Sequence, residues 1–304
     1  DTLYAIVNWG GDPGERPEGD LSGWIISIDA DGNVEPVVDV AAFEATGDPD
    51  AEFSGGVLDT NPHSLIQVDD GFVVADAGGN ALLGVAADGT VSVIAVFPPQ
   101  MHEFPAELLA AMGAPPESDG EMAPEGEEMA PEGEEMAADE MAEGEEMAPE
   151  GEEMASEGGM VPIPVESVPT SVVVGPDGAY YSAELTGGPF PVGGARVLRV
   201  EAGGEPEVYA TGLTNVMDLG FGPDGTLYVA EIVHEGLMPV FMGGDVPPIG
   251  AVMAVPAGGG EAELLASGEQ LMALGGLAVA DDGTIYVTAN TLTPGGGTLV
   301  RITP

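Results

Sequence analysis

The stretch NVMDLGFGPDGTLYVAEI, residues 215–232, defines the structural unit of this chain. One apolar run ends at a Gly-Pro-Asp-Gly turn, and a second apolar run with a tyrosine near its start follows. Asp-Gly between two apolar runs is a strong hairpin signal, because both residues tolerate the backbone angles of a tight turn. The stretch therefore predicts two antiparallel strands.

The same arrangement recurs at PTSVVVGPDGAYYSAEL (169–185), LGGLAVADDGTIYVTAN (274–290) and HSLIQVDDGFVVADAG (63–78). A second hairpin follows each unit, as in ALLGVAADGTVSVIAVF (81–97), and residues 23–40 match this second hairpin after the strand at 3–9. Repeated four-stranded antiparallel units without a helical period predict an all-β fold, a β-propeller. A β-sandwich is the alternative, but it would not repeat a two-hairpin unit at this spacing.

Five modules are visible, and a segment without the repeat, between the second and the third module, divides the chain into three parts. We expect propeller blades at 1–97, with the first visible blade incomplete, and further blades at 161–304. Between them, 98–160 is an acidic, Met-rich, low-complexity insert whose frequent Pro and Gly prevent a long helix. It is a solvated loop, a Cu(I)-binding run or a weak Ca²⁺ binder. We also expect an N-terminal piece of the ring to be missing here or to come from a partner chain.

The composition is strongly acidic. Four Arg and no Lys stand against 54 Asp and Glu, so the formal net charge is 4 − 54 = −50. Such a surface repels nucleic acid and anionic membrane and attracts divalent cations and basic partners. There is no cysteine, which excludes thiol catalysis and disulfides, and no apolar run long enough for a membrane span. The chain begins with Asp rather than Met, which suggests a processed, extracellular or periplasmic protein.

Candidate metal ligands stand at aligned positions of the modules. They open the innermost strands or end the second strands: Asn61, Asn215, Asp218, Asp76, Glu184 and Glu231. Carboxylates that converge near a propeller axis need a cation, a proton or water, and a hard ion with oxygen ligands, Ca²⁺ before Mg²⁺, satisfies them. Alternatively, these acids are solvated at the rim or accept backbone hydrogen bonds at turns.

Two histidines are candidate catalytic bases. His63 opens an inner strand, and His234 follows Glu231 closely enough to face the same end of the ring. A lone histidine is more often a structural hydrogen-bonding group. No GxSxG elbow, HExxH helix or phosphate-binding loop occurs in the sequence, so nothing else indicates a catalytic class.

Four stretches resemble a known family: DVAAFEATGDPDAEF (39–53), NPHSLIQVDDGFVVADAGGNALLGV (61–85), VPTSVVVGPDGAYYSAELTGGPFPVGGARVLRV (168–200) and TGLTNVMDLGFGPDGTLYVAEI (211–232). They are similar to the ScyD/ScyE family, NHL-like propeller proteins named for genes associated with scytonemin biosynthesis. The resemblance covers nearly everything except 98–160. It implies a secreted or periplasmic propeller with six blades, and it supplies no catalytic residues.

Two functions remain. The first, which we favour from the sequence, is a non-catalytic binding or scaffold module that assembles with itself or a matrix protein and is stabilised by cations. The second is a hydrolase similar to six-bladed lactonases of secondary metabolism. In that case Asn61, Asn215 and either Glu184 or Glu231 would hold a channel Ca²⁺, and His63 would be the base.

Overall fold

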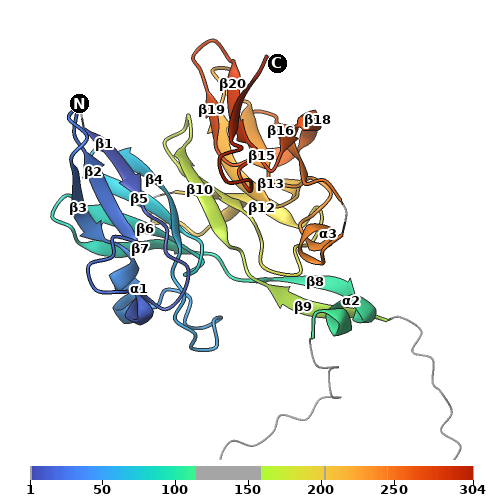
Figure 1. Ribbon diagram of the computed structural model, residues 1–304, viewed down its shortest axis with the longest axis horizontal. Coiled ribbons are helices and arrows are strands. Elements are labelled where there is room, and N and C mark those ends of the chain that lie inside the picture. The colour runs from blue at the N-terminus through green and yellow to red at the C-terminus, as the bar shows by residue number, and fades with distance from the viewer. Residues whose placement is uncertain (1, 114–158, 202, 245, 304) are drawn as a thin grey trace, which may run out of the picture. The chain divides into compact units, whose positions relative to one another are not determined.

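The computed structural model describes residues 2–113, 159–201, 203–244 and 246–303 (Figure 1). The Met-rich run at 121–154 lies outside the described residues, and so do the expectations placed on it. The chain divides into two compact units: 1–102 with 163–304, and 103–162. The sheets that carry the candidate functional site, described below, belong to the first unit.

The first unit consists of consecutive small sheets that follow the predicted repeat. Blade 1 contains β1 (Leu3–Ile6), β2 (Trp24–Ile28) and β3 (Val34–Asp39), with a 3₁₀ turn η1 (Pro13–Glu15) inside it and helix α1 (Ala41–Gly47) after it. Blade 2 contains β4 (Pro62–Val68), β5 (Gly71–Asp76), β6 (Ala81–Ala86) and β7 (Val91–Val96). All neighbouring strands in these two sheets run antiparallel.

The C-terminal half adds three more blades. Blade 3 contains β10 (Pro169–Val174), β11 (Tyr180–Glu184), β12 (Ala195–Val200) and β13 (Glu207–Leu213). Blade 4 contains β14 (Val216–Phe221), β15 (Leu227–Glu231), β16 (Ile249–Val255) and β18 (Glu263–Met272), with α3 (Met238–Phe241) between β15 and β16. Blade 5 contains β19 (Leu277–Val279), β20 (Ile285–Ala289) and β21 (Thr298–Ile302). The short β17 (Gly260–Glu261) pairs in parallel with β13 at the edge of blade 3.

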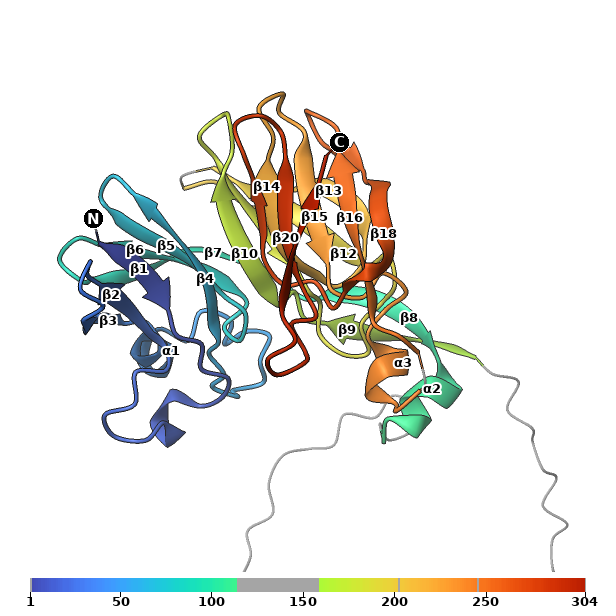
Figure 2. The same ribbon diagram turned by 45° about the horizontal axis from the view of Figure 1, so that its top comes forward.

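The inner strands lie side by side in chain order. β4 packs against β10, β10 against β14, and β14 against β19, while β1 packs against β4 (Figure 2). The predicted β-propeller is confirmed, with five blades of antiparallel strands in the described chain. The sixth blade that the family resemblance implies is not among the described residues.

Apolar side chains between neighbouring blades form the core. Tyr181 of β11 packs its ring edge-to-face on Phe221 of β14, with centroids 4.8 Å apart. Val197 in blade 3 and Val229 in blade 4 are fully buried in the same cluster. Each such side chain contributes about 1.5–3 kcal/mol of burial energy, so stacked sheets stabilise one another where a single four-stranded sheet could not. The interfaces hold the inner-strand ends in fixed positions.

The second unit is small. It contains α2 (Ala106–Ala111) and the parts of β8 (Gln100–Pro105) and β9 (Met160–Val165) that fall within 103–162, and these two strands pair with each other. Helix α2 begins directly after Pro105. In the described part of the chain, no helix has the length and apolarity that crossing a membrane requires.

Candidate functional site

Three inner strands carry the same irregularity at the same place. The pairing register shifts between the first and third residues of β4, β10 and β14, so the second residue of each strand is an extra one. These extra residues are His63, Thr170 and Met217. A β-bulge turns a side chain away from the face that strand alternation would give it, and bulges are common beside active sites. Blades 2, 3 and 4 therefore each present one re-aimed side chain.

A pocket of about 270 Å³ lies where these bulges meet. Its lining residues are His63, Ser64, Thr170, Met217, Asp218, Gly275 and Gly276, and we call it the inner-strand pocket. In the sequence alignment of the modules, Gly275 and Gly276 occupy the places of Met217 and Asp218. Two glycines at the blade 5 position leave the pocket open where larger side chains would fill it.

His63 has a defined orientation in this pocket. Its Nδ1 lies 2.7 Å from the backbone carbonyl oxygen of Thr170 in the neighbouring blade. A carbonyl can only accept a hydrogen bond, so Nδ1 carries the proton and donates it. In the neutral imidazole Nε2 then holds the free lone pair. Thr170 is fixed in turn, since its hydroxyl donates to the carbonyl of Val216 at 2.8 Å.

Asp218 is the carboxylate of the pocket. Its Oδ1 accepts from the Ser171 hydroxyl at 2.6 Å and from the Leu219 amide at 2.9 Å, and its Oδ2 accepts from the Leu277 amide at 2.6 Å. Burial raises the pKa of Asp218, while these donors and the charge of His63 act to lower it. Asp218 thus joins three blades and interacts electrostatically with His63.

The three aligned carboxylates of the second strands share one structural role. Each accepts a hydrogen bond from the segment that leads into its own blade's inner strand. The pairs are Thr60 Oγ1 with Asp76 at 2.7 Å, Ser167 Oγ with Glu184 at 2.7 Å, and the Thr214 amide with Glu231 at 2.7 Å. All three carboxylates are at most 1% exposed. These bonds satisfy polar groups that the fold buries between blades.

Asp76 and Glu184 have full sets of donors. Asp76 also accepts from the backbone amides of Asn61, Gly78 and Gly79 at 2.6 to 3.3 Å. Burial raises the pKa of Asp76, and these bonds oppose the rise. Glu184 accepts from Arg196 at both carboxylate oxygens, through Nε at 2.9 Å and Nη2 at 2.7 Å. This bidentate pair compensates the buried charge of Glu184.

Glu231 pairs with the second candidate base. His234 Nδ1 lies 2.5 Å from Glu231 Oε2, and the carboxylate is fully buried. Burial raises the pKa of Glu231, and the His234 and Thr214 bonds lower it. His234 does not line the inner-strand pocket. His234 and His63 therefore belong to different blades and to different sites.

The two candidate asparagines also make specific contacts. Asn215 is fully buried, its Nδ2 donates to the Leu185 carbonyl at 3.0 Å, and its Oδ1 accepts from the Leu237 amide at 3.0 Å. Asn61 Oδ1 accepts a longer bond, 3.4 Å, from Asn8 Nδ2. Neither asparagine lines the inner-strand pocket.

A different group of carboxylates could hold a metal ion. Within the described residues, ligand oxygens of Glu44, Asp48 and Asp50 all lie within 4.8 Å of one another, and we call these residues the Glu44 triad. Sequence reasoning missed it because it lies outside the hairpin repeat. Its sequence signal is three acids in seven residues, EATGDPD (44–50), around the end of a short helix.

No model of a known protein family matches the chain, and no curated protein matches it. Solved structures do resemble it. A putative gluconolactonase is 15% identical with a TM-score of 0.47, covering 93% of this chain and 67% of its own. A gluconolactonase from Xanthomonas campestris is 16% identical with a TM-score of 0.45, covering 100% and 78%. Virginiamycin B lyase from Staphylococcus aureus is 11% identical with a TM-score of 0.45, covering 99% and 73%. The structural neighbours are gluconolactonase-like, NHL-type β-propellers.

The neighbours named here are enzymes by their descriptions, contrary to the non-catalytic binding or scaffold module that the sequence favoured. That preference arose because no local motif in the sequence indicates catalysis. The histidine, the two hydroxyl side chains and the carboxylate that line the inner-strand pocket come from blades 2, 3 and 4 and meet only in the folded chain.

Proposed function

We propose that the inner-strand pocket is the active site of a hydrolase acting on a small ester or lactone, with His63 as the general base. One observation carries the proposal. A histidine oriented through Nδ1 by the Thr170 carbonyl shares a pocket of about 270 Å³ with the half-buried Asp218. This leaves Nε2 as a proton acceptor beside an acidic group, which is the arrangement that general-base catalysis needs.

The reaction is a water addition. His63 Nε2 takes a proton from a water molecule as the water oxygen attacks the carbonyl carbon of the substrate. The carbon–oxygen bond to the leaving alkoxide then breaks, and the proton returns from His63 to that alkoxide. The products are a carboxylic acid and an alcohol, joined in one molecule if the substrate is a lactone. Asp218 stabilises the imidazolium that forms in between, because opposite charges favour each other strongly away from water.

Ser64 completes the proposed machinery. It follows His63 on β4 and lines the same pocket. A hydroxyl group there can donate a hydrogen bond to the substrate oxygen as negative charge develops on it. We assign Ser64 this stabilising role and no covalent step.

The pocket by itself does not fit a calcium ion. Ca²⁺ takes six to eight oxygen ligands. The pocket supplies one carboxylate, Asp218, which already accepts three hydrogen bonds. The other proposed ligands do not line this pocket, and each makes hydrogen bonds elsewhere: Asn61, Asp76, Glu184, Asn215 and Glu231. No catalytic step is therefore routed through a metal, and the calcium proposal moves to the Glu44 triad.

Hydrolysis of a panel of small aliphatic esters and of γ- and δ-lactones tests this function. Purified protein should release acid, measured by pH-stat titration, and His63→Asn should reduce the rate by about 10²–10⁴-fold. Gln67→Ala, an exposed change on the same strand, is the matched control and should leave the rate unchanged. A rate that His63→Asn does not alter, in a variant with an unchanged circular dichroism spectrum, would contradict the proposal.

We also propose a family and a cellular location for this protein. The phrases PFPVGGARV (189–197) and VADAGGNALL (74–83) support membership of the ScyD/ScyE family, which would place this hydrolase in the extracellular or periplasmic space. A net charge of −50 is compatible with a matrix of basic partners or with assembly bridged by cations. Fractionation of cells that express the tagged protein, with blotting of each fraction, tests the location.

A further inference from the structure

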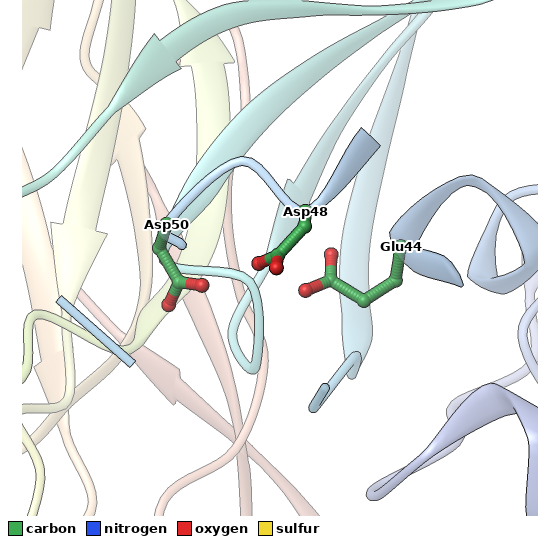
Figure 3. Close-up of side chains that lie close together, drawn as sticks. All are labelled: Glu44, Asp48 and Asp50. Carbon is green, nitrogen blue, oxygen red and sulfur yellow. The ribbon is translucent and has the colours of Figure 1, made fainter. Parts of the chain in front are cut away.

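The end of helix α1 folds one carboxylate back toward another. Asp48 caps α1 in the left-handed conformation, with φ of 31°, and its amide donates to the Glu44 carbonyl at 3.0 Å. This turn reverses the chain at 47–48. Figure 3 shows the Glu44 and Asp48 carboxyl groups turned toward each other, with Asp50 on the far side of Asp48. Three carboxylates thus face one small space.

The central observation is a buried carboxylate without partners. Glu44 is 2% exposed, and neither of its carboxylate oxygens has a hydrogen-bond partner in the described structure. One oxygen of Asp48, Oδ1, is likewise buried and unbonded. A buried polar group without a partner costs free energy, and a buried charge without one costs more. The buried oxygens of Glu44 and Asp48 therefore require a partner other than a hydrogen-bond donor of the protein.

The charged groups that act on Glu44 are all negative. Burial is the main cause that raises the pKa of Glu44 to about 8, and the negative charges of Asp76, Asp59 and the other two members of the triad add to the rise. Burial also raises the pKa of Asp50. Two things relieve such a cluster: protons or a cation. All available ligand atoms are carboxylate oxygens, which hard divalent cations prefer.

The triad is also built into the blade packing. Asn80 Nδ2 donates to Asp50 Oδ2 at 2.8 Å, and Asn80 Oδ1 accepts from the Val168 amide at 3.0 Å, at the entry to β10. A side chain at Gly79 would come within 2.9 Å of Glu44 Oε2, so the turn after β5 closes over the carboxylate. Hydrogen bonds connect the triad to blades 2 and 3, while α1 follows blade 1.

We propose that the Glu44 triad binds a single hard divalent cation, Ca²⁺ in preference to Mg²⁺, as a structural site. Glu44, Asp48 and Asp50 supply the protein oxygens, and water completes the shell. Ca²⁺ is favoured because it accepts flexible coordination, whereas Mg²⁺ demands a near-ideal octahedron. The site fixes the α1 loop to the turn between β5 and β6, separately from the inner-strand pocket.

Thermal unfolding of the full chain in CaCl₂ tests the site. After treatment with a chelator, the protein should gain about 5 °C in Tm at a CaCl₂ concentration one hundred times the dissociation constant. Isothermal titration with CaCl₂ should show one site. Glu44→Gln keeps the shape of the side chain and removes its charge, and it should weaken Ca²⁺ binding at least tenfold and abolish the Tm shift.

Glu52→Gln is the matched control. Glu52 is exposed, lies two residues beyond Asp50 and makes the same change in net charge. It should keep the full response to CaCl₂. Asp48→Asn is a second test variant if Glu44→Gln does not fold, and it should also lose the response.

Three outcomes would overturn the proposal. The first is no calorimetric binding of CaCl₂ to the wild-type chain. The second is equal binding by Glu44→Gln and wild type, which would place the ion elsewhere on this acidic chain. The third is an equal loss of response in Glu52→Gln, which would show a general counterion effect. None of these readouts measures catalysis, so they are independent of the proposed hydrolase.

Discussion

The buried carboxylates of the blades and those of the α1 loop have opposite surroundings. Asp76, Glu184 and Glu231 stand at repeat positions, and each has hydrogen-bond donors from the fold itself. Glu44 is just as buried but has none. The repeat provides each blade carboxylate with a donor from the entering chain, since every blade is built alike. The loop after blade 1 lies outside the repeat, so its carboxylates must be compensated in another way.

This difference teaches how to interpret a buried acid. A buried carboxylate with donors is part of the framework, and the half-buried Asp218, which also has donors, lies in a pocket with a histidine. A buried carboxylate without donors indicates a proton or a cation. Burial alone does not distinguish these cases, and the hydrogen bonds do.

Glu184→Ala should have the largest effect on stability. It leaves Arg196 without its bidentate partner and the Ser167 hydroxyl without its acceptor, so the free energy of unfolding should fall by about 3–5 kcal/mol. Urea unfolding followed by circular dichroism measures this. A loss below about 1 kcal/mol would remove the contrast between the blade carboxylates and the triad.

Asp218→Asn should reduce hydrolysis by about ten- to a hundredfold, provided that the proposed function holds, because the imidazolium of His63 loses a neighbouring negative charge. Asparagine keeps the shape of the side chain but has one accepting oxygen in place of two, so the Tm should also fall by a few degrees, because one of the three hydrogen bonds to Asp218 is lost. Steady-state kinetics on the ester or lactone that the wild type hydrolyses provide the measurement. A large fall in Tm with unchanged kcat would make Asp218 a framework carboxylate like Glu184.

Glu44→Gln should stabilise the protein in a chelator, by roughly 3–6 °C at about pH 8.5 and by less at about pH 6. The folded-state pKa of Glu44 is raised from 4.5 to about 8, so the folded state disfavours its ionised form. The wild type therefore loses stability as the pH rises from 4.5 through 8, and glutamine does not. Asp48, Asp50, Asp59 and Asp76 all contribute to this rise.

Differential scanning calorimetry of wild type and Glu44→Gln across this pH range checks the expectation. Glu52→Gln again serves as the control and should follow the wild type. A Glu44→Gln variant less stable than the wild type in chelator at high pH would mean that Glu44 has a donor after all.

Asp177→Ala should have the smallest effect. Asp177 pairs with Arg199 at 2.6 Å, but its side chain is 39% exposed. An exposed ion pair contributes about 0–1 kcal/mol, and Arg199 keeps Glu201 at 2.7 Å. Urea unfolding of Asp177→Ala beside Glu184→Ala measures the contrast between an exposed and a buried pair. Equal losses in both variants would show that burial does not decide the energy.

Much of the fold could be predicted because it is local. Each Asp-Gly turn with its flanking apolar runs determines a hairpin, and the repeat of hairpins determines stacked blades. Asn61, Asp76, Glu184, Asn215 and Glu231 were found at aligned positions for the same reason. The residues that donate hydrogen bonds to the three carboxylates could not be predicted. These donors, Thr60, Ser167 and Thr214, lie in connecting segments that carry no pattern of their own.

The two proposed sites differ in how far the sequence could lead to them. Pointing to His63 and Asp218 was possible because both open inner strands. The bulges that aim them into one pocket are a matter of strand register, which the amino-acid pattern does not specify. The Glu44 triad had no expected role at all, although its acids stand within seven residues of each other.

The sequence by itself determined the hairpins, their repeat and the surplus of negative charge, because each depends on neighbouring residues or on composition. Only the tertiary structure decided which acids are compensated and which are not. Hydrogen bonding and burial depend on residues that are far apart in the chain and come together when the blades stack. That is why the sequence showed neither the donors around Glu184 nor their absence around Glu44.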